Sequence, residues 1–97
     1  MARIELAAGV GEDFERIIDH LARYEVADIP SRISGIIQAI AVLERNPLIG
    51  RPTREDKREL IIGRRGRGYV ALYRYVPEID IVFVLALRSQ REAGYKS

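Results

Sequence analysis

The stretch RELIIGRRGRGYVALYRYVPEIDIVFVLALRSQREAGY, residues 58–95, decides the fold, because it holds three apolar runs separated by two turns. Gly63, Gly66 and Gly68 accept a positive φ and mark the first turn. Pro77 cannot donate a hydrogen bond to a strand ladder, so it marks the second turn. The stretch predicts three antiparallel strands followed by a polar tail that carries arginines.

The second and third of these strands differ in what they bury. Residues 81–87, IVFVLAL, are consecutive apolar residues. This run is too short to span a bilayer and is typical of a central strand covered on both faces. Residues 69–76 instead mix polar and apolar positions, and successive side chains of a strand point to opposite faces. Their alternation places Tyr69, Ala71, Tyr73 and Tyr75 on one face and Val70, Leu72, Arg74 and Val76 on the other.

The first quarter of the chain predicts a strand and then a helix. Residues 3–6, RIEL, alternate polar and apolar side chains and predict a short strand that ends near Gly9 and Gly11. From Glu12 onward the apolar residues recur at helical spacing. We therefore expect a helix from residue 12, with Asp13 in an acidic first turn near the positive end of the helix dipole.

A second helix is predicted to open at Asp28 and to end before Pro47, because aspartate caps free amides and the residue before proline avoids helical dihedrals. Two amphipathic helices joined by a few residues predict an antiparallel hairpin packed on the sheet. Gly35 is unfavourable inside a helix, and we interpret it as a point where the helices approach closely. Leu48 and Ile49 are expected to anchor the following loop to the core.

Length and composition indicate one globular α+β domain over residues 1–97. The chain is 47% hydrophobic and 31% charged, has no cysteine and has one histidine. Disulfides, thiolate chemistry and multi-histidine metal sites are thereby excluded, and no cofactor is expected. The N-terminal residues do not resemble a signal peptide, and no apolar segment reaches transmembrane length. A cytoplasmic location without membrane attachment is the expectation.

Positive charge lies in the half of the chain that forms the sheet. Residues 1–57 hold eight Lys/Arg against ten Asp/Glu, whereas residues 58–97 hold eight against four. A net charge of +2 attracts nucleic acid weakly, so any such binding depends on how the arginines cluster. The densest basic spot is Arg64, Arg65 and Arg67 in the first turn. Plain solubility of a hairpin is the alternative explanation for it.

Three local motifs, in this order and spacing, carry a resemblance to a known family. They are NPLIGRP at residues 46–52, YRY at 73–75 and VLALRSQRE at 84–92, placed after a strand and a helical hairpin. With them the chain resembles the RelE/ParE superfamily of bacterial type II toxins over nearly its whole length. The resemblance implies an N-terminal strand, an antiparallel two-helix hairpin and three antiparallel strands in a small sheet.

The resemblance also implies a toxin that a cognate antitoxin binds and neutralises, the antitoxin being of a ribbon-helix-helix, ParD-like kind. Members similar to ParE poison DNA gyrase, and members similar to RelE enter the ribosome and cleave messenger RNA. The fold does not choose between the two. A toxin-like domain without toxicity is the third hypothesis.

Residue types favour the gyrase-directed, non-enzymatic hypothesis. Ribonucleolytic members need side chains that move protons and stabilise phosphorane charge. Val70 stands where RelE-like nucleases are expected to carry an arginine, and residues 60–62 are apolar where such nucleases carry lysines. Four residues remain as candidates for a ribonuclease, namely Arg74, Arg88, Arg91 and Tyr95.

Target binding is the other role open to the arginines. A strand arginine such as Arg74 either pairs with a helix carboxylate or reaches a functional groove. Arg88 and Arg91 can contact phosphate or simply end the strand in solvent. Tyr95 can stack on a base or cover an edge of the core. The predicted target-binding set is Arg64, Arg65, Arg67, Arg74, Arg88 and Arg91.

Overall fold

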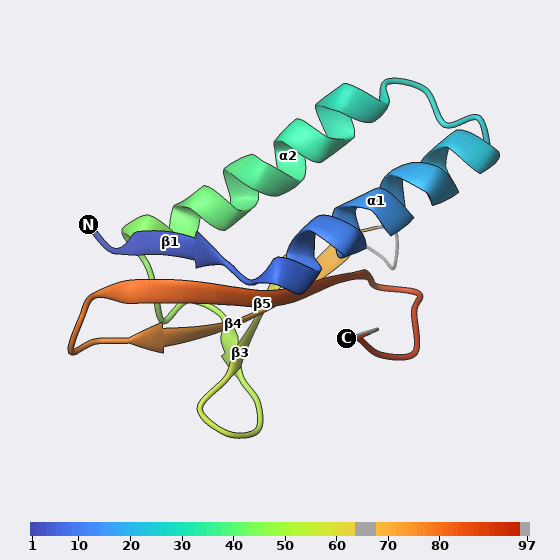
Figure 1. Cartoon of the computed structure of the whole chain (residues 1–97). Helices are drawn as coiled ribbons and strands as arrows, with labels where there is room; N and C mark the ends of the chain where they lie inside the picture. The colour runs from blue at the N-terminus through green and yellow to red at the C-terminus, as the bar shows by residue number, and fades with distance from the viewer. Residues whose placement is uncertain (64–67, 96–97) are drawn as a thin grey trace.

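The sheet and the helices form two layers. The computed structural model describes residues 1–63 and 68–95. It shows a strand, two helices and then a run of strands, with both helices over one face of the sheet (Figure 1). This confirms the predicted α+β architecture. We call the sheet face that carries the helices the inner face and the opposite face the outer face.

The sheet has five strands in the order β1-β5-β4-β3-β2. β1 runs parallel to β5, whereas the β5–β4, β4–β3 and β3–β2 pairs are antiparallel. The two-residue β2, which lies in the loop after the helices, was not predicted. The strands are β1 Arg3–Leu6, β2 Arg51–Pro52, β3 Arg58–Ile62, β4 Tyr69–Val76 and β5 Ile81–Ser89.

The first helix, α1, spans Ala8–Arg23 and begins one turn before the predicted start. The expectation that Gly9 and Gly11 end the preceding strand is therefore wrong, because both lie inside α1. Burial explains the early start, since the first turn places Val10 in the core with no exposed surface. That gain offsets the cost of glycine in a helix, roughly 1 kcal/mol each.

The second helix, α2, spans Ile29–Ala41 and starts directly after Asp28, as predicted, but the Asp28 side chain makes no capping hydrogen bond. Its end was predicted too late, because a 3-10 turn, η1 Val42–Glu44, follows it. The backbone and side-chain N–H groups of Asn46 both donate to the Val42 carbonyl, which tightens this last turn. Gly35 does not mark a close helix approach, because a Cβ built there meets nothing within 4 Å.

The core lies between the helices and the inner face. The predicted alternation in β4 is confirmed, because Ala71 and Tyr73 are fully buried in the helix-facing cluster. β5 contributes Val82, Val84 and Leu87 to the same cluster. A register shift opposite Leu72/Tyr73 pairs Tyr73 with Val84 and Leu72 with Ala86, so Leu85 is an extra residue. This β-bulge brings Leu87 to the inner face.

The loop between η1 and β2 is held by polar contacts and not by its apolar residues. Leu48 and Ile49 are 59% and 58% exposed, so the expectation that they anchor the loop is wrong. The Gly50 N–H instead donates to the Tyr73 hydroxyl at 2.8 Å. Arg58 donates to the carbonyls of Leu48 and Gly50 at 3.0 and 2.8 Å. The loop is thus fastened to β3 and β4.

Candidate functional site

Two candidate arginines share the outer face but lie apart. Arg74 in β4 pairs with Phe83, and Arg88 in β5 pairs with Val70. Four residues of β4 therefore separate the two positions, which at strand rise is roughly 13 Å. The structure does not bring them together around one small ligand.

Arg88 forms a cluster with Tyr95 and Glu59 on the outer face. The Arg88 guanidinium carbon lies 5.1 Å from the centre of the Tyr95 ring, a cation–π distance. The Tyr95 hydroxyl donates to Glu59 Oε2 in β3 at 2.7 Å. The C-terminal tail thus crosses the sheet from β5 to β3.

Proton affinities in this cluster oppose acid–base chemistry by the tyrosine. Burial and the hydrogen bond to Glu59 raise the pKa of Tyr95 far above the ordinary value. The hydrogen bond from Tyr95 lowers the pKa of Glu59, and Arg51 adds to the effect. A tyrosine held this strongly protonated is poorly matched to proton transfer at neutral pH.

Acidification is expected to release the tail from β3. A carboxyl whose pKa is lower in the folded than in the unfolded chain stabilises the fold above its unfolded pKa. That stability is lost as the pH falls through the folded pKa. For Glu59 the loss occurs at pH values below 4.5, the ordinary value of its pKa.

The Tyr95→Phe variant should show a higher Glu59 pKa in an NMR titration of the carboxyl carbon, because it lacks the hydroxyl that donates to Glu59.

Tyr24→Phe is the matched control for this titration, since Tyr24 is 66% exposed and its ring contacts His20. It should leave the Glu59 titration unchanged. Equal Glu59 titrations in the wild type and in Tyr95→Phe would contradict the assigned contact.

An ion network centred on the buried Asp13 fastens the tail to α1. Asp13, 2% exposed, accepts from the Leu87 N–H at 2.9 Å and from Arg16 at 2.8 Å. Arg16 also donates to the Leu87 carbonyl at 3.2 Å and to Glu92 at 2.9 Å. Glu92 in turn accepts from the Ser89 N–H. The prediction that Asp13 occupies the first helical turn was wrong, because α1 begins at Ala8.

This network caps the part of β5 that extends past the end of β1. β1 pairs with β5 only as far as Val84, and beyond it the edge of β5 would present unpaired backbone groups. Side chains of α1 satisfy the N–H and C=O groups of Leu87 in place of another strand, and Glu92 of the tail accepts from the Ser89 N–H. Sequence reasoning misassigned Asp13 to the first helical turn and missed Arg16 and Glu92.

The remaining arginine candidates fall elsewhere. Arg91 is exposed, and its backbone N–H donates to the Ser89 hydroxyl at 3.2 Å. Arg64, Arg65 and Arg67 lie outside the described residues. Arg74 does not pair with a helix carboxylate, because its guanidinium donates to the Glu55 carbonyl at 3.1 Å. It instead lines a groove of about 480 Å³ that Lys57 and Arg58 share.

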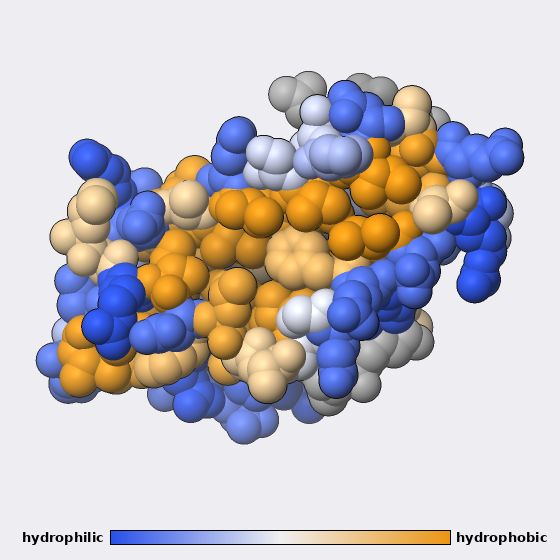
Figure 2. Space-filling view, turned by 45° about the horizontal axis from the view of Figure 1, so that its top comes forward, coloured by the Kyte–Doolittle hydropathy of each residue, from blue (hydrophilic) through white to orange (hydrophobic). Residues whose placement is uncertain are grey.

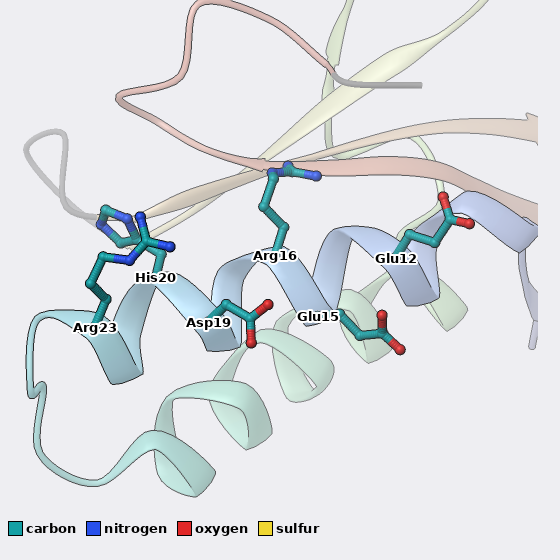
Figure 3. Close-up of a pocket in the computed structure, with 6 residues that line it drawn as sticks. All are labelled: Glu12, Glu15, Arg16, Asp19, His20 and Arg23. Carbon is teal, nitrogen blue, oxygen red and sulfur yellow. The ribbon is translucent and has the colours of Figure 1, made fainter.

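The exposed side of α1 carries a shallow polar pocket of about 410 Å³ (Figure 3). Its lining mixes acidic and basic side chains, with Arg16 and His20 pointing toward the sheet side of the helix and Glu15 and Asp19 away from it. Within residues 1–63 and 68–95, no group of three or more His, Asp or Glu residues is placed to hold a metal ion. The same part of the chain has no helix with the length and apolar character needed to cross a membrane.

An apolar band runs over the face that presents the helices (Figure 2). β1 and the helices contribute exposed apolar side chains, namely Leu6 at 56%, Ile18 at 37% and Ile37 at 55%. Phe14 and Ile33, one turn before Ile18 and Ile37, are partly buried against the core. A contiguous apolar band on an exposed face is typical of an interaction surface.

Comparison with known proteins agrees with the architecture. A search of curated proteins gives no match. The family model described as the ParE toxin of the type II toxin–antitoxin system parDE matches residues 4–94. This span runs from within β1 to the residue before Tyr95. The chain therefore belongs to the ParE toxin family of type II toxin–antitoxin systems.

Proposed function

We propose that the protein inhibits DNA gyrase by binding it and performs no chemistry of its own. The observation that carries the proposal is the separation of the nuclease candidates. Arg74 stands four β4 residues away from the position that pairs with Arg88, and the hydroxyl of Tyr95 is already bonded to Glu59. Membership of the ParE family supports the same target.

The test is direct inhibition of purified gyrase. We expect the wild-type chain to arrest supercoiling or to trap cleaved DNA in a concentration-dependent manner. A gyrase that stays unaffected at saturating toxin contradicts the proposal. Induction without antitoxin should also stop colony formation, and normal colonies would favour a toxin-like domain without toxicity.

Ribosome-dependent cleavage of messenger RNA is the second candidate, favoured by the contact between Arg88 and Tyr95. It predicts cuts at codon positions in translated messages, lost when Arg91 or Tyr95 is replaced. Transcripts that remain intact on induction would reject this candidate.

A type II toxin implies an antitoxin partner, and the apolar band on the helices suits its binding segment. An amphipathic helix places its apolar face into such a surface, and Ile18 and Ile37 provide exposed anchors on α1 and α2. We therefore propose that a ribbon-helix-helix, ParD-like antitoxin covers this band. The protein is proposed to act in the cytoplasm, where gyrase is found.

Ile37→Glu should weaken antitoxin binding by at least about tenfold, because the complex would bury a carboxylate among apolar groups. Ile79→Glu is the matched control, because Ile79 is 56% exposed in the turn between β4 and β5, away from the helices. Isothermal titration calorimetry with the purified antitoxin measures the affinities of both variants. Equal affinity of the two variants would place the antitoxin elsewhere.

A further inference from the structure

The groove beside Arg74 lies at one end of the sheet. The turn that joins β2 to β3 projects below the sheet in Figure 1, and the turn between β4 and β5 closes its left end. Both turns contribute to the walls of the groove, whose volume is about 480 Å³. The site is therefore built by segments that are far apart in the sequence.

Three cations line the groove, and none of them has a carboxylate partner among the described residues. Arg58 donates to the carbonyls of Leu48 and Gly50, and Arg74 donates to the carbonyl of Glu55. The third cation is Lys57. Elsewhere Arg16 and Arg51 both pair with carboxylates.

Arg74 is the cation of this groove that carries a shielded and unpaired donor. Its Nε is shielded from solvent and has no hydrogen-bond partner. A shielded donor on a charged group is costly to leave unpaired, and an anion that accepts from it removes this cost. The residues that the structure describes supply an acceptor for one terminal nitrogen of this guanidinium but none for its Nε.

The other lining residues indicate what kind of anion fits. Asp56 and Glu78 border the groove, so its net charge is small, which disfavours a nucleic-acid strand with one charge on every phosphate. Leu48, 59% exposed, and Pro52 and Pro77 add apolar surface. Apolar and cationic groups side by side suit a peptide that carries acidic and apolar side chains together.

We propose that this groove binds an acidic segment of gyrase, an inference that rests on the proposed gyrase target. A carboxylate of the segment accepts from the Arg74 guanidinium and is attracted by Lys57. A neighbouring apolar side chain of the segment packs on Leu48 and Pro77. The antitoxin band on the helices is a separate surface.

The test compares the affinities of toxin variants for purified gyrase free of DNA, measured by surface plasmon resonance. Arg74→Gln should weaken binding by about tenfold or more, and Lys57→Gln by a smaller factor. Arg3→Gln removes an exposed cation that pairs with Glu5 in β1, and it should bind within about twofold of wild type. All three should bind the antitoxin as the wild type does, which shows that they fold.

The outcomes separate the groove from the target. If Arg74→Gln and Lys57→Gln both bind gyrase as tightly as the wild type, the proposed role of the groove is wrong, and gyrase remains the target. Absence of gyrase binding by the wild type overturns both. A third outcome is that the variants bind DNA-free gyrase normally and lose affinity only for the gyrase–DNA complex. This result would assign the groove to DNA phosphate and contradict the proposal that it binds a peptide segment.

Discussion

Gly50→Ala is expected to destabilise the fold by roughly 1–3 kcal/mol, toward the upper end of that range, through overpacking. A Cβ at this position would lie 2.7 Å from both Cε1 and the hydroxyl of Tyr73 and 2.9 Å from the Glu59 carbonyl oxygen. Tyr73 is fully buried and cannot retreat without disturbing the core. The added methyl group must therefore push the loop away and break the Gly50–Tyr73 hydrogen bond.

Urea unfolding followed by circular dichroism measures this loss. Gly35→Ala is the matched control, because its new Cβ meets nothing within 4 Å. That variant should gain about 1 kcal/mol from the better helix propensity of alanine. A Gly50→Ala variant as stable as the wild type would show that the loop tolerates displacement.

Asp13→Ala is expected to cost about 3 kcal/mol or more. The substitution removes the acceptor of the Leu87 N–H and one partner of Arg16 in a site where Asp13 is 2% exposed. Taking one member from a buried ion pair costs about 3–5 kcal/mol, and here the Leu87 N–H loses its acceptor while Arg16 keeps Glu92. Arg16 is 31% exposed, so water offsets part of this cost.

Glu15→Ala is the control for this substitution, because Glu15 is an exposed carboxylate on the same helix. It should change stability by less than about 0.5 kcal/mol. Hydrogen exchange gives a second measurement, since the Leu87 amide should lose protection selectively in Asp13→Ala. An unchanged exchange rate at Leu87 would contradict the capping role.

The sheet could be predicted from the sequence because its signals are local. Pro77 and the alternation across residues 69–76 specify a strand, a turn and the face that Tyr73 occupies. The start of α1 depends on long-range contacts, because Val10 packs into the core cluster. Propensity alone cannot supply this information, because tertiary burial overrides the cost of Gly9 and Gly11.

The candidate site was predicted less completely than the fold. Arg74 lies on the predicted face, whereas Tyr95 contacts Glu59 and Arg88 on the outer face of the sheet. The groove beside Arg74 was missed because Lys57 and Arg58 reach it only through a turn. One available signal was overlooked. Asp13 falls between Val10 and Ile17 on the buried side of α1, and a carboxylate in an apolar stripe requires a buried partner.

The parallel pairing of β1 with β5 has a consequence for synthesis of the toxin. Arg3 lies opposite Ile81, so β1 leaves the ribosome well before the strand that it pairs with. At roughly 5–20 residues per second, the N-terminal segment waits on the order of ten seconds for that partner. Any chain that ends before β5 lacks the strand with which β1 pairs. A prematurely released fragment should accordingly be harmless to the cell that makes it.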